Sequence, residues 1–187
     1  GLMLCHEIEG PREELATMLP TSGTTTDGDT VTVTGVAMLA LMRSGGVRGV
    51  AMEVSSHALA LARVDGLEFD VAVFTNLTQD HLDLHGSMEA YFAAKARLFT
   101  EHLDGDAVVR VDTPEGRRIA DLARGRVIRC SLREAADVRV VHWTSTLDGT
   151  ELTAETPVGT LHLRSPMIGE YNVENIACAI GVGVALG

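Results

Sequence analysis

The chain has 187 residues, of which 45% are apolar and 22% are charged, enough for one compact domain and incompatible with disorder as the main state. Its formal net charge is -11 and its basic side chains form no cluster, which excludes binding to a nucleic acid backbone. Aromatic residues make up only 4%, which excludes a stacking platform for single strands. We expect an acidic globular domain.

The three cysteines, Cys5, Cys130 and Cys178, are far apart and form no C-x-x-C pair. This spacing disfavours a disulfide framework or a cysteine zinc site. No apolar run is long enough to span a membrane, and no secretory signal is visible, so a cytoplasmic protein is expected. The chain opens at Gly1 and stops directly after an apolar helical pattern, so both ends are expected to be cuts within a longer protein.

The predicted elements of the first half alternate between helices and strands. Pro11 with Glu13 and Glu14 predicts a short helix over 11–19, and the Thr- and Gly-rich residues 20–30 predict a loop. The pattern then predicts, in order, a strand at 31–34, a helix at 35–44, buried strands at 47–54 and 70–75, and a helix at 87–99 capped by Ser87.

The second half continues with a strand at 106–111, a helix at 113–123 and a strand at 127–128. Residues 137–164 then alternate between apolar and polar side chains and contain two turn signals, which predicts an antiparallel meander. An Ala-, Val- and Ile-rich helix is predicted over 172–186. The predicted fold class is α/β, a mainly parallel sheet flanked by helices with a small antiparallel meander.

Two polar stretches follow predicted strands, where ligands bind in open α/β sheets. Met52–His57 ends the strand at 47–54, and Thr75–Asp83 ends the strand at 70–75. Glu53 and His81, with a further oxygen ligand, would suit Mg²⁺. The alternative is that Asp80 and Asp83 cap a helix and His81 is an ordinary polar residue. A zinc site at His81 and His85 is disfavoured because Leu82 stands where the zincin motif needs a glutamate.

Ser55, Ser56 and His57 are adjacent in the sequence but lack the G-x-S-x-G turn of a serine nucleophile. We expect their polar groups to bind a substrate. Lys95 is the only lysine of the chain and lies on the predicted helix at 87–99. Position alone favours a surface lysine whose stem lies along an apolar face.

Taken together, the stretches at 52–66, 69–86 and 88–99 resemble the Mur ligase family, and most closely its MurE type. A fourth stretch, 169–177, resembles the family's G-x-x-N-x-x-N-x-x-A element, with Asn172 and Asn175 in the asparagine places and Cys178 in place of the alanine. The resemblance implies the central domain of an ATP-dependent ligase. Such a ligase adds diaminopimelate or lysine to UDP-N-acetylmuramoyl-L-alanyl-D-glutamate through an acyl-phosphate, in peptidoglycan synthesis.

The resemblance also implies roles for particular residues. Glu53 and His81 would hold Mg²⁺, and Lys95 would be carbamylated, which turns an ammonium that repels the metal into an anion that supports it. These three form the expected catalytic and metal set. The expected substrate contacts are Ser55, His57, Arg63 and Asn76, and the expected ATP contacts are Asn172 and Asn175. A monomer is expected for the complete protein.

The chain departs from the family pattern at its N-terminal end. The family's Gly-Thr-x-Gly-Lys-Thr loop needs a lysine, and in the nearest similar stretch, 25–30, that place is Asp29. Residues 21–34 are therefore interpreted as a hairpin or loop. Leu61 stands where some relatives have a polar substrate contact.

The resulting domain prediction is a divergent segment at 1–35 and a central ATPase-type domain at 36–187, without its P-loop strand. The uridine-binding and amino-acid-selecting domains are expected to be absent, so the chain alone should not ligate. Two alternatives stay open. One is a catalytically dead module that binds a muramoyl nucleotide, and the other is a folylpolyglutamate- or cyanophycin-type ligase of the same superfamily.

Overall fold

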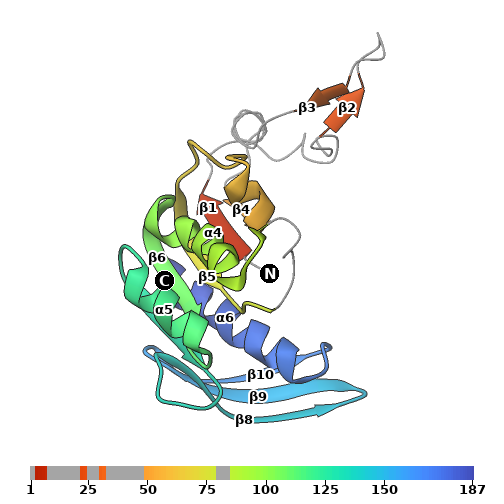
Figure 1. Cartoon of the computed structure of the whole chain (residues 1–187). Coiled ribbons are helices and arrows are strands. Elements are labelled where there is room, and N and C mark those ends of the chain that lie inside the picture. The colour runs from red at the N-terminus through yellow and green to blue at the C-terminus, as the bar shows by residue number, and fades with distance from the viewer. Residues whose placement is uncertain (1–2, 8–21, 25–29, 33–48, 79–84) are drawn as a thin grey trace.

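The computed structural model describes residues 3–7, 22–24, 30–32, 49–78 and 85–187 (Figure 1). The strands are β1 (Met3–Glu7), β2 (Ser22–Thr24), β3 (Thr30–Thr32), β4 (Gly49–Glu53), β5 (Phe69–Phe74), β6 (Leu103–Arg110), β7 (Val127–Ser131), β8 (Val138–Thr146), β9 (Gly149–Thr156) and β10 (Gly159–Ser165). The helices are α2 (Ser56–Ala60), α4 (Met88–Thr100), α5 (Pro114–Leu122) and α6 (Glu170–Leu186).

Eight of the described strands form one sheet in the order β10-β9-β8-β7-β6-β5-β1-β4. The pairs β5/β6, β6/β7 and β7/β8 are parallel, and β8, β9 and β10 form the antiparallel meander. The predicted parallel body and meander are both confirmed. β1 lies between β4 and β5 and is antiparallel to both, so β4 and β5 run in the same direction.

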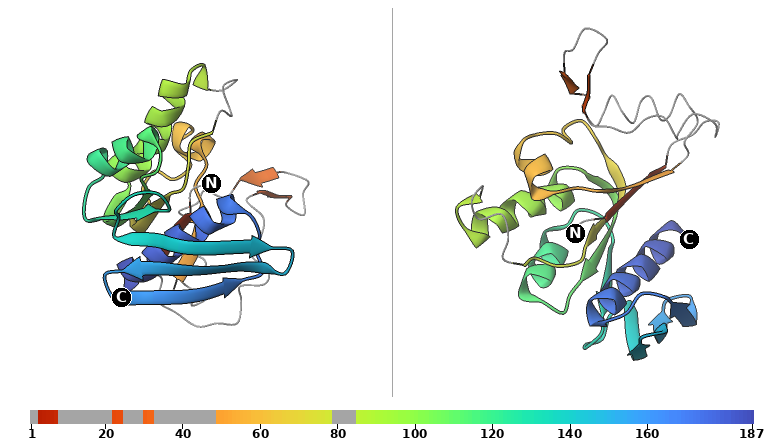
Figure 2. Two further views of the ribbon diagram at one scale, coloured as in Figure 1. Left: turned by 90° about the horizontal axis from the view of Figure 1, so that it is seen from below. Right: turned by 90° about the vertical axis from the view of Figure 1, so that its right-hand side faces the viewer.

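Helices cover both faces of the sheet (Figure 2). Strand residues alternate between the faces, because successive side chains of a strand point in opposite directions. On β5 and β6, Ala72, Phe74 and Val109 pack with α2, α4 and α5, while Val73 and Val108 pack with α6.

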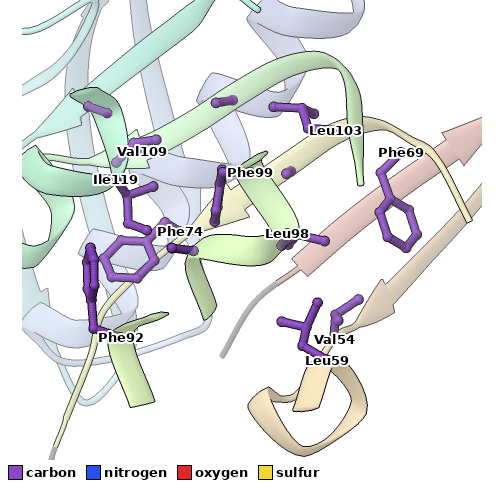
Figure 3. Close-up of a cluster of buried hydrophobic side chains, with 14 of the residues drawn as sticks. Val54, Leu59, Phe69, Phe74, Phe92, Leu98, Phe99, Leu103, Val109 and Ile119 are labelled. Carbon is purple, nitrogen blue, oxygen red and sulfur yellow. The ribbon is translucent and has the colours of Figure 1, made fainter. Parts of the chain in front are cut away.

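The first apolar cluster lies under α2, α4 and α5 (Figure 3). Phe74 of β5 and Phe99 of α4 meet edge to face, with ring centroids 6.3 Å apart. Both are fully buried, as are Leu59 of α2 and Leu98 of α4. Edge-to-face contact between rings adds to the gain from their burial. This cluster anchors α2 and α4, the helices that carry the predicted serine, histidine and lysine residues.

The predicted helix starts are confirmed by their caps. The Ser87 hydroxyl accepts a hydrogen bond from the backbone N–H of Ala90 at the start of α4, and Thr113 does the same from Gly116 at the start of α5. Pro114 occupies the first turn of α5, where its missing N–H costs no helical hydrogen bond.

Several boundaries and elements differ from the prediction. β6 begins at Leu103 instead of residue 106, and α6 begins at Glu170 instead of residue 172. The sequence prediction contained neither β1 nor α2, which is a single turn. β2 and β3 pair antiparallel, which confirms the hairpin expected within 21–34.

The helices predicted at 11–19 and 35–44 lie outside the described residues, as does most of the stretch at 25–30. Among the described helices, none is both long enough and apolar enough to cross a membrane.

Candidate functional site

The carboxyl ends of β4, β5, β6 and β7 lie at one edge of the sheet, because these strands run in the same direction. Glu53 ends β4, Thr75 and Asn76 follow β5, and Arg110 ends β6. Polar residues therefore gather where an open α/β sheet binds its ligands. This edge is the candidate site.

A cavity of about 490 Å³ opens beside β4, β5 and α6. It brings together three of the predicted site residues, Glu53, Asn76 and Asn175. Its remaining lining is one threonine and a set of apolar or weakly polar side chains, namely Thr75, Ala51, Met52, Val73, Met167, Ile176, Cys178, Ala179 and Val182. An apolar cavity with a few polar groups is the usual form of a small-molecule site.

The two asparagines of α6 are placed differently. Asn175 is exposed and lines the cavity. Asn172 donates a hydrogen bond from Nδ2 to the carbonyl oxygen of Ile168, at 2.8 Å, and is not among the cavity residues. In this structure the Asn172 side chain bonds the backbone just ahead of α6. Asn175 forms part of the cavity wall and can contact a ligand there.

Ser55, Ser56 and His57 lie at the start of α2, directly after the short link that follows Glu53. Ser55 is exposed and caps the helix, since its hydroxyl accepts a hydrogen bond from the N–H of Ala58 at 3.1 Å. Ser56 is buried, and its Oγ lies 3.0 Å from Nε2 of His85. Arg63 is exposed beyond the other end of α2 and is not part of the cavity wall.

Lys95 is only 6% exposed, so the prediction of a surface lysine from its helix pattern is wrong. Its Nζ lies 5.1 Å from the ring centroid of Tyr91, one turn earlier on α4. The Tyr91 ring in turn stacks on His85, with centroids 5.1 Å apart, and His57 meets His85 edge to face at 6.0 Å. Burial of a charged group is costly and marks Lys95 as a candidate functional residue.

The predicted metal site is only partly described. Glu53 contributes an exposed carboxylate to the cavity, while His81, Asp80 and Asp83 lie outside the described residues. Within the described part of the chain, no group of three or more His, Cys, Asp or Glu residues could hold a metal ion. A single carboxylate still fits Mg²⁺, which often takes one or two protein carboxylates and completes its shell with water and phosphate oxygens.

The sequence prediction missed a buried ionic network at the same edge of the sheet. Arg110 Nη2 contacts Glu174 Oε1 of α6 at 2.5 Å, and Arg110 Nε donates to Asp112 at 3.3 Å. Asp112 also accepts hydrogen bonds from the Ser131 hydroxyl and the N–H of Leu132. The signal in the sequence was the pair of charged residues, Arg110 and Asp112, at the end of an apolar strand.

This network joins the strand ends to the first turns of α6. Arg110 Nη1 also lies 3.5 Å from the carbonyl oxygen of Thr75, which lines the cavity. Burial raises the pKa of Glu174 above its ordinary value, although Arg110 opposes the shift, and Glu170 and Asp112 add to it. Glu174 precedes Asn175, so the ion pair fixes the part of α6 that forms the cavity wall.

Comparison with known proteins identifies the family. The family model of the Mur ligase middle domain matches residues 10–183. The UDP-N-acetylmuramoyl-L-alanyl-D-glutamate--2,6-diaminopimelate ligase of Geobacter metallireducens is 50% identical over 149 residues, which cover 76% of this chain and 29% of that protein. The ligase of the same name from Xylella fastidiosa is 47% identical over 154 residues, covering 79% of this chain and 31% of that protein.

Solved structures agree with these matches. The structure of a UDP-N-acetylmuramoyl-L-alanyl-D-glutamate--2,6-diaminopimelate ligase superposes with a TM-score of 0.71 at 31% identity, covering 81% of this chain and 32% of that chain. MurF from Acinetobacter baumannii gives a TM-score of 0.57 at 26% identity, covering 63% of this chain and 26% of that one. The chain thus spans about three tenths of the length of the relatives it matches, and through its middle domain it belongs to the Mur ligase family.

Proposed function

We propose that this chain is the central part of a cytoplasmic, ATP-dependent ligase of peptidoglycan precursor synthesis. The ligase joins diaminopimelate or lysine to UDP-N-acetylmuramoyl-L-alanyl-D-glutamate. The observation that carries the proposal is the identity of 50% over 149 residues to a ligase of that name. The cavity supports it, because Glu53, Asn76 and Asn175 meet there although they come from three separate stretches of the chain.

In this proposal different residues of the cavity bind different parts of the ATP molecule. Asn175 offers an amide that can hydrogen-bond a nucleobase, and the apolar wall around Ile176 and Ala179 can contact its flat faces. Glu53, with His81, holds Mg²⁺. The bound ion neutralises phosphate charge, which is the main requirement of phosphoryl transfer. Ser55, His57, Arg63 and Asn76 contact the muramoyl substrate, and Asn172 supports Asn175 from the preceding turn.

Lys95 acts as its carbamate in this proposal. A buried amine that adds carbon dioxide and releases a proton becomes a carboxylate-like anion, and such oxygen ligands suit a hard divalent cation. The burial of Lys95 supports this role, because a lysine that served only solubility would extend its amine into water.

A second candidate is a binding module that holds a muramoyl nucleotide without ATP chemistry. It is favoured by one observation: Lys95 on α4 is the only lysine of this chain, so these 187 residues contribute no lysine to a phosphate-binding loop. A charge of the wrong sign stands in the nearest similar stretch, at Asp29.

The two functions are separated by an assay of the protein encoded by the reading frame on both sides of this segment. With Mg²⁺, ATP and the UDP-muramoyl dipeptide, addition of diaminopimelate or lysine should release ADP and form an amide product. Glu53→Gln should reduce this activity by about a hundredfold or more, because it removes a charged metal ligand. Glu68→Gln, at an exposed position after α2, is the matched control.

The chain of residues 1–187, assayed alone, should form no amide. Absence of ADP release by the longer protein with either amino acid overturns the ligase proposal. If the UDP-muramoyl dipeptide still binds the chain in that case, the result supports the second candidate, a module that binds a muramoyl nucleotide without ATP chemistry.

A further inference from the structure

Arg110, at the end of β6, lies behind the cavity and touches the residue that precedes each of two cavity asparagines. Nη1 of Arg110 lies 3.5 Å from the carbonyl oxygen of Thr75, and that carbonyl belongs to the peptide bond that leads to Asn76. Nη2 of the same guanidinium contacts Oε1 of Glu174 at 2.5 Å, and Glu174 directly precedes Asn175 on α6. One side chain is therefore in contact with both stretches that carry a cavity amide.

The two asparagines stand on different walls of the cavity. Asn76 follows β5, which belongs to the sheet, whereas Asn175 belongs to α6, which packs against one face of that sheet. The spacing of the two walls therefore depends on how the start of α6 sits on the strand ends. Arg110 is not among the residues that line the cavity. It can act on a ligand there only through the position of the two walls.

The guanidinium of Arg110 has little freedom to move. Its Nε donates a hydrogen bond to Oδ2 of Asp112 at 3.3 Å. The Asp112 side chain is 1% exposed and also accepts hydrogen bonds from the Ser131 hydroxyl and the N–H of Leu132. The side chains of Arg110 and Glu174 are 9% and 14% exposed, so salt screens their attraction less than it screens a surface pair. Because the guanidinium is planar and rigid, these three contacts fix one another's directions.

We propose that Arg110 is a positioning residue that couples the binding of two substrates. The inference rests on the proposed function, in which Asn175 contacts ATP and Asn76 contacts the muramoyl substrate. When one substrate orders its own wall, the contacts of Arg110 order the other wall as well, so the second substrate loses less conformational entropy on binding. Each substrate should therefore bind more tightly when the other is present, and by the same factor in both directions, because coupling between binding free energies is reciprocal.

Lysine in place of Arg110 separates the charge from the geometry. An ammonium group keeps the positive charge beside Glu174, but it is a compact point charge that cannot also span the distance to Thr75 as a rigid fork does. Arg110→Lys should therefore fold and lose the coupling. The matched control is Arg126→Lys. Arg126 precedes β7, at the opposite edge of the sheet, and donates two hydrogen bonds to Asp106, so the same substitution there also disrupts an arginine–carboxylate contact.

The test measures binding to the longer protein that contains this chain. Calorimetry gives the dissociation constant of the UDP-muramoyl dipeptide without and with a saturating, non-hydrolysable ATP analogue and Mg²⁺. In the parent and in Arg126→Lys the analogue should tighten binding of the dipeptide by at least about fivefold. In Arg110→Lys this gain should fall to about twofold or less. Titration of the analogue with and without the dipeptide should give the same factor in each protein.

Hydrogen exchange followed by mass spectrometry is the second readout on the same proteins. Peptides that contain Asn76 and Asn175 should exchange faster in Arg110→Lys than in the parent, because both walls lose a shared anchor. In Arg126→Lys these peptides should exchange at the parental rate. If Arg110→Lys does not fold, Glu174→Gln replaces it in both measurements, since it keeps the shape of the side chain and removes the charge that Arg110 contacts.

The outcomes separate this inference from the ligase proposal. If the parent forms the amide product and Arg110→Lys keeps the full gain in affinity, the inference is wrong and the ligase proposal stands. The inference is equally wrong if a parent that forms the amide shows no gain. If the parent forms no amide, the ligase proposal fails and the exchange rates decide the role of Arg110. Faster exchange of both peptides in Arg110→Lys then supports a positioning residue, and unchanged rates overturn it.

Discussion

Nε2 of His85 and Oγ of Ser56 lie 3.0 Å apart, although the two residues are separated by 29 positions in the sequence. This hydrogen bond joins the start of α2 to the residue just ahead of α4. His85 also stacks on Tyr91, whose ring lies 5.1 Å from Nζ of Lys95. Ser56 and Lys95, which the sequence suggested as separate pieces of one site, are thus linked through His85 and Tyr91.

The Ser56–His85 contact should contribute measurably to stability. Ser56→Ala removes the buried hydroxyl and leaves Nε2 of His85 without this partner, which should lower the free energy of unfolding by about 1 kcal/mol. Urea denaturation of the chain measures the change. Thr160→Ala, on the exposed edge strand β10, is the control and should change stability by less than about 0.5 kcal/mol. Equal effects of the two substitutions would show that the contact is energetically neutral.

Glu174 should give the stability a pH dependence of a defined sign. Burial raises its pKa in the folded chain above the ordinary value of 4.5, so the folded state holds this proton more tightly than the unfolded state. The stabilisation from this proton is fully present below the ordinary pKa and is lost as the pH rises through the raised one. Glu174→Gln removes this titration and keeps the shape of the side chain.

The measurement is urea denaturation of the parent chain and of Glu174→Gln at several pH values. The stability of the parent relative to the variant should be greatest at the acidic end and should decline as the pH rises toward neutrality. A difference that stays constant with pH would mean that the ion pair with Arg110 balances burial, and a difference that grows with pH would mean that the ion pair outweighs it.

Carbamylation of Lys95 can be detected directly. With ¹³C-labelled bicarbonate, the chain should show a carbamate resonance that Mg²⁺ strengthens, because the cation favours the anionic form. Lys95 is the only lysine, so the N-terminal amine of Gly1 is the one other amine able to form this adduct. Lys95→Arg should lose the magnesium-sensitive resonance and keep only the terminal one. Identical spectra of the parent and the variant would remove Lys95 from the proposed metal site.

The parts of this fold that the sequence predicted are those set by local signals. Ser87, and Thr113 with Pro114, mark helix starts because their side chains and ring geometry act within one turn. Glu53 and Asn76 could be placed at one edge because the carboxyl ends of strands running in the same direction share an edge. Both inferences need only the order of elements along the chain.

The parts that the sequence did not predict depend on packing between distant segments. α2 is one turn long, too short for a hydrophobic period, and it is held by Leu59 in the core and by Ser56 on His85. The Arg110–Glu174 pair forms only when α6 packs on the strand ends. Lys95 is buried because α4 is covered by α2 and α5 as well as by the sheet, which its own helix pattern does not show.

The close packing of α6 on the sheet should make two glycines of this helix respond in opposite directions to alanine. Alanine is the better helix former, and at Gly183, where a new Cβ would meet nothing within 4 Å, Gly183→Ala should stabilise the chain by up to about 1 kcal/mol. At Gly181 the same Cβ would collide with Cys130 and Val108. The helix would have to move away from β7, so Gly181→Ala should cost about 1 to 3 kcal/mol.

Thermal and urea denaturation of the two variants measure this contrast. Because both variants replace glycine by alanine in the same helix, the gain in helix propensity cancels in the comparison. If Gly181→Ala is as stable as Gly183→Ala, α6 does not rest on β7 as closely as described.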